Sequence, residues 1–204
     1  MATVDPGPTS IRPLTPESWP LFEALVDRHG GIFGGCWCTY FHPDCAERGP
    51  GAKGNRVYKR QLVEQGVARA ALVIRDGEDG EEAVAWAEFG KPEQLPGLHH
   101  LTQYLADLDA EGESEPDYRV TCIFVDRRYR RHGLVTRALD GALDLIAQDG
   151  GGVVEGYPHV PREKKVSASF LYNGTQSVYE RAGFAFVRPK GQVNTVMRRE
   201  VAPA

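Results

Sequence analysis

The feature that most constrains this fold is an apolar run, followed by a glycine-containing loop and an amphipathic segment. Residues 119–125 include Val-Thr-Cys-Ile-Phe-Val, which is typical of a strand covered on both faces. Residues 136–148 carry apolar side chains at helical spacing, and glycines at 150–152 end this predicted helix. A further strand at 153–157 completes a strand–helix–strand unit, which predicts two parallel central strands.

The flanking segments predict an antiparallel front half and a closing pair of strands. Two apolar strands at 68–74 and 82–89 surround Gly77 and Gly80, which suit a hairpin turn. The other predicted elements are a strand at 11–14, helices at 16–29, 56–65 and 175–182, and strands at 185–188 and 194–198. The sequence therefore predicts an α/β fold with a mixed sheet flanked by helices.

Composition indicates one domain and excludes some partners. A chain of 204 residues with 41% apolar side chains can bury one core, so we expect a flexible tail at 1–10 and a single domain at 11–200. A net charge of −4 gives no general attraction to nucleic acid or anionic lipid. No apolar run approaches the roughly 18 residues of a membrane span, and the first residues lack a signal-peptide pattern, so we expect a cytoplasmic protein.

An acidic stretch interrupts the apolar pattern before the central strand. Residues 107–117 contain six carboxylates and almost no apolar side chain. Charge runs of this kind are usually solvated. We therefore predict an acidic insertion at about 106–117 that forms a surface loop.

The loop between the central strand and its helix has the chemistry of an anion site. Gly133 allows the backbone to approach a ligand closely, and the free N–H groups at the helix start favour a pyrophosphate. Four arginines, at 127, 128, 130 and 131, add attraction for an anion.

Two motifs in this order resemble the GNAT superfamily of N-acetyltransferases. Arg130, Gly133 and Val135 occupy the family's Gln/Arg-x-x-Gly-x-Gly/Ala positions after the strand end Val-Asp. About 40 residues on, Asn173 and the run Tyr179-Glu-Arg-Ala-Gly-Phe resemble the family's last helix. The segment Gly-Cys-Trp-Cys at 35–38 is also similar to a bacterial GNAT subgroup. Order and context make the pair far more specific than either motif alone.

The resemblance implies a GNAT-like fold whose parallel central strands splay apart to admit acetyl-CoA. It implies direct transfer of the acetyl group to a small-molecule amine in a ternary complex, with Tyr179 as the acid that protonates the CoA thiolate. The residues that it implies for binding acetyl-CoA are Phe124, Val125, Arg130, Arg131, His132, Gly133, Leu134, Val135, Thr136 and Asn173. A homodimer is possible, and a CoA-binding sensor without turnover is the alternative.

The general base is harder to assign. The family's usual carboxylate position corresponds to Arg119, which cannot accept a proton. Glu155 and Glu88 are the candidates, with Glu155 slightly favoured, because burial would raise the pKa of a carboxyl group towards the range of a base. Each also fits a structural carboxylate satisfied by a nearby donor. A backbone N–H near Val125 is the expected partner of the acetyl oxygen.

Four zinc-compatible side chains lie close together at Cys36, Cys38, His42 and Cys45. Paired cysteines of structural zinc sites usually have two or more residues between them, and aromatic residues separate these ligands. We therefore favour buried or pocket-lining thiols and predict no metal. A small zinc-binding interaction protein is the remaining alternative.

Overall fold

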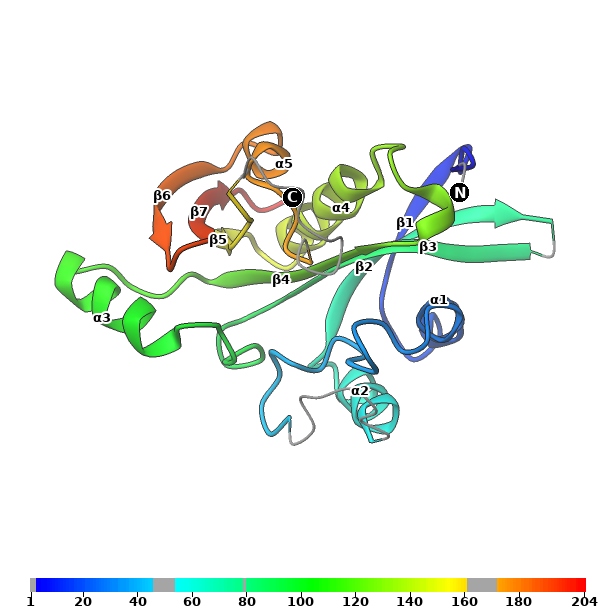
Figure 1. The fold of residues 1–204 in the computed structure, drawn as a ribbon, viewed down its shortest axis with the longest axis horizontal. Helices are drawn as coiled ribbons and strands as arrows, with labels where there is room; N and C mark the ends of the chain where they lie inside the picture. The colour runs from blue at the N-terminus through cyan, green and yellow to red at the C-terminus, as the bar shows by residue number, and fades with distance from the viewer. Residues whose placement is uncertain (1–2, 46–53, 79, 161–171) are drawn as a thin grey trace.

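The computed structural model describes residues 3–45, 54–78, 80–160 and 172–204. Within these ranges, one mixed sheet has the strand order β1-β2-β3-β4-β5-β7-β6 (Figure 1). The strands are β1 (Thr9–Pro13), β2 (Arg69–Gly77), β3 (Gly80–Gly90), β4 (Tyr118–Val125), β5 (Gly152–Gly156), β6 (Ala185–Lys190) and β7 (Asn194–Val201). Among these seven described strands, only β4 and β5 pair in parallel. The predicted mixed sheet is confirmed.

Helices cover both faces of the sheet. Figure 1 shows α1 and α2 below it and α4 and α5 above it. Their bounds are α1 (Trp19–Arg28), α2 (Asn55–Glu64), α3 (Leu101–Glu111), α4 (Leu134–Gln148) and α5 (Gln176–Arg181), with a 3₁₀ turn η1 at Arg127–Tyr129. The predicted helices and strands are all present, with ends shifted by a few residues. Among the described residues, no helix is both long enough and apolar enough to cross a membrane.

The predicted surface loop at 107–117 is wrong for its first part, which belongs to α3. Tyr104 and Leu108 are buried on one side of this helix, and the carboxylates occupy its solvated side. Gly112, with φ of 65°, ends the helix, and the Glu113 N–H donates to the Leu108 carbonyl at 2.9 Å. The acidic composition masked an apolar spacing of three and four residues that begins at Leu101.

Among the described residues, three apolar clusters hold the helices to the sheet, and two of them lie on its opposite faces. On the upper face, Ala138, Leu139 and Ala142 of α4 are fully buried against the central strands. On the lower face, the Phe22 ring of α1 lies 5.0 Å from the Trp86 ring, which stacks on Phe124 at 4.8 Å. The central strands are therefore covered on both sides, as their apolar runs predict.

The parallel pair separates before β4 ends, which confirms the predicted splay. Pairing runs from Tyr118↔Val154 to Val120↔Gly156, whereas β4 continues to Val125. Beyond that point the N–H of Ile123 donates to the carbonyl of Tyr172 at 2.6 Å. On the side of β5, the fold thus leaves β4 without a paired strand where the loop to α4 begins, while β3 stays paired on the other side.

Candidate active site

The loop after β4 is built to present backbone N–H groups. The Asp126 side chain accepts from the Arg128 N–H at 2.9 Å and starts η1. Gly133, with φ of 74°, precedes α4, whose first backbone bond runs from the Arg137 N–H to the Gly133 carbonyl. The N–H groups at 134–136 therefore have no partner within the helix. A 15-residue helix also adds the positive end of its dipole there.

A pocket of about 760 Å³ lies between this loop and the splayed end of β4. It is lined by residues after α1, at the end of β4, at the start of α4 and on α5: His29, Ile32, Phe33, Gly34, Ile123, Phe124, Val125, Arg127, Arg130, Arg131, Gly133, Leu134, Val135, Thr136, Val178 and Arg181. Among the described residues, its ionisable side chains are four arginines and His29, with no carboxylate. Such a pocket favours an anionic ligand.

The pocket brings together the residues predicted to bind acetyl-CoA, except His132 and Asn173. The exposed His132 side chain has Nε2 3.3 Å from Oγ1 of Thr3. Asn173 is buried and donates from Nδ2 to the Tyr157 carbonyl at 3.1 Å, so it fastens the end of β5. The alternation of β4 also places the Val125 N–H on the splayed side, because the Ile123 N–H points there and the Asp126 N–H bonds to Val84 of β3.

No protein-family model and no curated protein sequence matches this chain. Among solved structures, a mosquito arylalkylamine N-acetyltransferase like 5b superposes with a TM-score of 0.57 at 15% identity, covering 95% of this chain and 100% of that one. An agmatine N-acetyltransferase mutant gives 0.56 at 12% identity, covering 94% and 99%. A putative GNAT-family acetyltransferase from Desulfovibrio desulfuricans gives 0.51 at 18%, covering 96% and 100%.

This chain has the GNAT fold. The expectation from the two sequence motifs is thereby confirmed for the architecture, while identities of this size leave the activity to be argued from the site.

Tyr179 lies where the parallel strands of this GNAT fold separate. A Cβ atom on Gly156 would stand 1.9 Å from Cε1 of Tyr179, so the glycine makes room for the ring. The side chain is fully buried, and its hydroxyl has no hydrogen-bond partner among the described residues. Burial raises the pKa of Tyr179, so its phenol is protonated at neutral pH. A buried hydroxyl without a partner is costly unless a ligand completes it.

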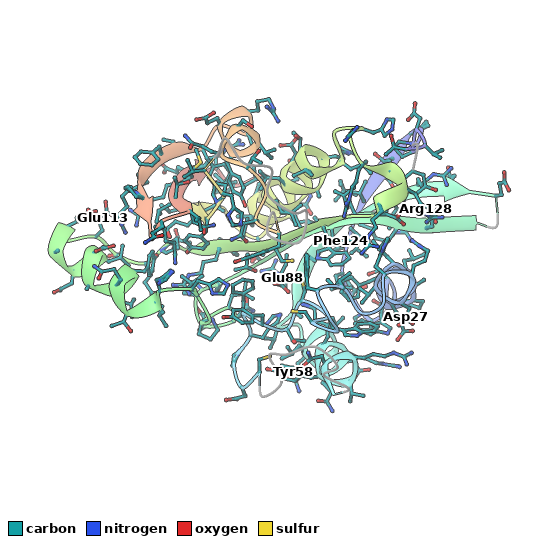
Figure 2. The ribbon with its side chains drawn as sticks, in the orientation of Figure 1. Asp27, Tyr58, Glu88, Glu113, Phe124 and Arg128 are labelled. Carbon is teal, nitrogen blue, oxygen red and sulfur yellow. The ribbon has the colours of Figure 1, made fainter. Side chains whose placement is uncertain are left out.

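Glu88 does not have the predicted character of a base. Its Oε1 lies 2.5 Å from Nζ of Lys59 and 3.3 Å from Nε2 of His42, and Thr121 donates to Oε2 at 2.8 Å. Burial acts to raise the pKa of Glu88, but the charge of Lys59 and the contact with His42 outweigh it and lower that pKa to about 2. Figure 2 places Glu88 beneath the central strands, on the face that carries α2. The expected upward shift is wrong, because the buried Lys59 ammonium stabilises the charged form of Glu88.

Glu155 also accepts hydrogen bonds from residues outside the pocket lining. It is fully buried and accepts from Tyr104 at 2.8 Å, from Tyr157 at 2.9 Å and from Nε of Arg198 at 2.6 Å. Three donors hold its oxygens, which corresponds to the structural alternative in the sequence analysis. Arg119, its register partner on β4, is buried and donates to the Leu95 carbonyl at 2.9 Å. Neither predicted carboxylate lines the pocket, and Tyr179 directly follows the lining residue Val178 in sequence without lining the pocket itself.

The zinc-compatible side chains have other neighbours. The His42 Nε2 atom lies 3.1 Å from Nζ of Lys59, and the Cys45 thiol lies 3.5 Å from Oγ1 of Thr39. All four cysteines are free thiols, and burial raises the pKa of Cys36 to about 11. Within the described ranges, no group of three or more ligand-type side chains is arranged to hold a metal ion.

Sequence reasoning missed the residues that enter the pocket from the lower face. His29 ends α1, and Ile32, Phe33 and Gly34 follow in the loop. The Phe33 ring meets Phe124 edge-on at 6.1 Å. The only available signal was the cluster of aromatic residues after Gly31, which the sequence analysis could not connect to β4.

Proposed function

We propose that this protein is an acetyl-CoA-dependent N-acetyltransferase that acts on a small-molecule amine. The observation that carries the proposal is one pocket that brings together a helix start, four arginines and the end of β4 that has no β5 partner. Acetyl-CoA combines a pyrophosphate with a thioester arm, and these features complement the two ends of that environment.

The residues present fit acetyl-CoA, which would supply the activated acetyl group. The N–H groups at 134–136 and the arginines at 130 and 131 would hold the pyrophosphate. The Val125 N–H would bind the acetyl oxygen at the splayed edge of β4. Tyr179 would give its hydroxyl proton to the departing sulfur, and its hydroxyl has no other described partner to compete for that role.

The lining of the pocket supports an acceptor with an apolar or aromatic substituent. Ile32, Phe33 and Phe124 form its apolar side, and Phe33 keeps 37% of its surface exposed. Aromatic rings provide flat contact area and attract a nearby ammonium group. Two of the solved structures with a similar fold are named as an arylalkylamine N-acetyltransferase-like protein and an agmatine N-acetyltransferase. These two amine classes guide the choice of amines for an assay.

The alternative function is a CoA-binding sensor without turnover, and the absence of a carboxylate from the described pocket lining is the observation that favours it. Thiol release from acetyl-CoA with a panel of amines separates the two functions. The panel is 2-phenylethylamine, tryptamine, agmatine and spermidine. An acetyltransferase releases thiol with at least one amine above the rate without amine, whereas a sensor is stabilised by acetyl-CoA and releases none.

Heat stability tests cofactor binding separately from turnover. A ligand that binds only the folded state raises the free energy of unfolding by about 2.7 kcal/mol at a concentration of about 100 Kd. We expect acetyl-CoA to raise the melting temperature, and no shift at saturating concentrations would overturn the proposal. A cytoplasmic location, a possible homodimer and the domain limits at 11–200 stay predictions.

A further inference from the structure

The proposed transfer requires a group that accepts a proton from the amine, and the two carboxylates expected for that role are unsuitable. Glu88 is paired with Lys59, and Glu155 is held by three donors. Neither lines the pocket, and no other carboxylate does so among the described residues. The arginines of the lining cannot accept a proton at working pH.

His29 is the one remaining basic side chain of the described pocket lining that can take up a proton. We propose that His29 is the general base of the acetyl transfer, an inference that rests on the proposed function. His29 accepts the proton that the amine nitrogen loses as its bond to the acetyl carbon forms. The C–S bond breaks, sulfur leaves with the electron pair, and Tyr179 supplies its proton. Solvent then returns a proton to Tyr179 and takes one from His29.

Three neighbours fix the position of the imidazole. His29 directly follows the last turn of α1, where its backbone N–H donates to the Val26 carbonyl at 3.0 Å. Its ring meets the Phe124 ring edge-on at 5.0 Å. Its Nε2 lies 3.3 Å from Oδ1 of the fully buried Asp126, although without the alignment of a hydrogen bond. The ring is thus held at the end of β4 rather than free in solvent.

Burial of His29 favours a neutral imidazole. Burial lowers the pKa of His29, Asp126 opposes that shift, and the charges of Arg127 and Arg28 reinforce it. The side chain as a whole retains 9% of its surface exposed, while its Nε2 atom is buried beside Asp126. A neutral imidazole is the form that a general base requires.

The test compares His29→Gln with the parent, using acetyl-CoA and the fastest amine of the panel. We expect kcat/KM to fall about 100-fold while the dissociation constant of acetyl-CoA changes less than about threefold. In the parent, kcat/KM rises with pH through the titration of His29, below the ordinary histidine pKa of about 6.5. This rise in kcat/KM disappears in the variant. The rise that comes from deprotonation of the amine substrate remains.

A matched control and a second readout keep the result specific. His100 is exposed and outside the pocket lining, so His100→Asn should retain the activity and pH profile of the parent. The NMR signal of the His29 ring, identified by its loss in His29→Gln, should titrate below about pH 6.5 in the protein without ligand.

Three results would overturn the assignment. They are a His29 titration above about pH 7, a kcat/KM for His29→Gln within about threefold of the parent, and weaker acetyl-CoA binding with unchanged kcat. A parent protein that releases no thiol with any amine would instead overturn the proposed function, and His29 with it.

Discussion

Nζ of Lys59 lies 2.5 Å from Oε1 of Glu88, and both side chains are 99% buried. Lys59 comes from α2 and Glu88 from β3, so the pair joins a helix to the sheet. Figure 2 shows Glu88 beneath the central strands. Lys59 also donates to the Cys38 carbonyl at 3.1 Å, which fixes the segment between α1 and α2. This ion pair is therefore a structural element of the lower face of the protein.

Removing one partner of this pair should strongly destabilise the fold. Lys59→Met leaves the Glu88 carboxylate buried without its cation, which typically costs about 3–5 kcal/mol. Urea unfolding measures the loss. The double variant Lys59→Met with Glu88→Leu should recover part of it, because no lone charge remains. A double variant as unstable as the sum of the single variants would show that the pair is not coupled.

The lowered pKa of Glu88 predicts how this contribution depends on pH. Folding stability from Glu88 is fully present above its ordinary pKa of 4.5 and is lost as pH falls towards about 2. Glu88→Gln cannot titrate. The stability difference between parent and Glu88→Gln should therefore be largest near neutral pH and shrink below about pH 4.5. Urea unfolding from about pH 6 to pH 3 checks this, and a constant difference would contradict it.

Gly133→Val should abolish the stabilisation by acetyl-CoA. The φ of 74° at Gly133 strains a β-branched residue by about 1–2 kcal/mol, and the new side chain would enter the pocket. Gly66→Val is a matched control, because Gly66 has a φ of 70°, open space around it and no place in the pocket lining. Both variants should melt earlier than the parent, but only Gly66→Val should retain the acetyl-CoA shift. An equal shift in both would refute the loop assignment.

Local patterns were sufficient to predict the strands, the crossover and the turn at Gly133 that precedes α4. The apolar run at β4 and the turn at Gly133 depend on neighbours within a few residues. The strand and the turn can therefore be predicted from the sequence. Helix α3 was missed because acidic residues mark its solvated side and only Tyr104 and Leu108 are buried. The apolar spacing of α3 was present in the sequence, but the six carboxylates at 107–117 favoured the prediction of a loop.

The partners of the buried charged groups could not be predicted in the same way. Lys59 and Glu88 are 29 residues apart, and β-sheet register decides which buried carboxylate meets a cation. His29 and Asp126 are 97 residues apart and meet because α1 ends at the edge of β4. The pKa of a buried group depends on such long-range contacts. Burial predicted from a strand pattern alone therefore gives the wrong direction for the pKa shift of Glu88.

The hydroxyl of Tyr179 should matter for turnover and not for folding. Tyr179→Phe keeps the ring against Gly156 and removes a buried hydroxyl that has no described partner, so stability should stay equal or increase. Loss of a positioned acid lowers kcat and kcat/KM together by about 100-fold, with the dissociation constant of acetyl-CoA unchanged.

Tyr104→Phe is the matched control for Tyr179→Phe. It deletes a buried hydroxyl that donates to Glu155 at 2.8 Å outside the pocket lining, so it should cost about 1 kcal/mol of stability and leave kcat within about threefold. The deficit of Tyr179→Phe should also shrink with thioesters whose thiolate is a better leaving group, because departure then depends less on the acid. A kcat for Tyr179→Phe within about threefold of the parent would leave Tyr179 with a packing role alone. Weaker acetyl-CoA binding at unchanged kcat would instead make the hydroxyl a binding contact.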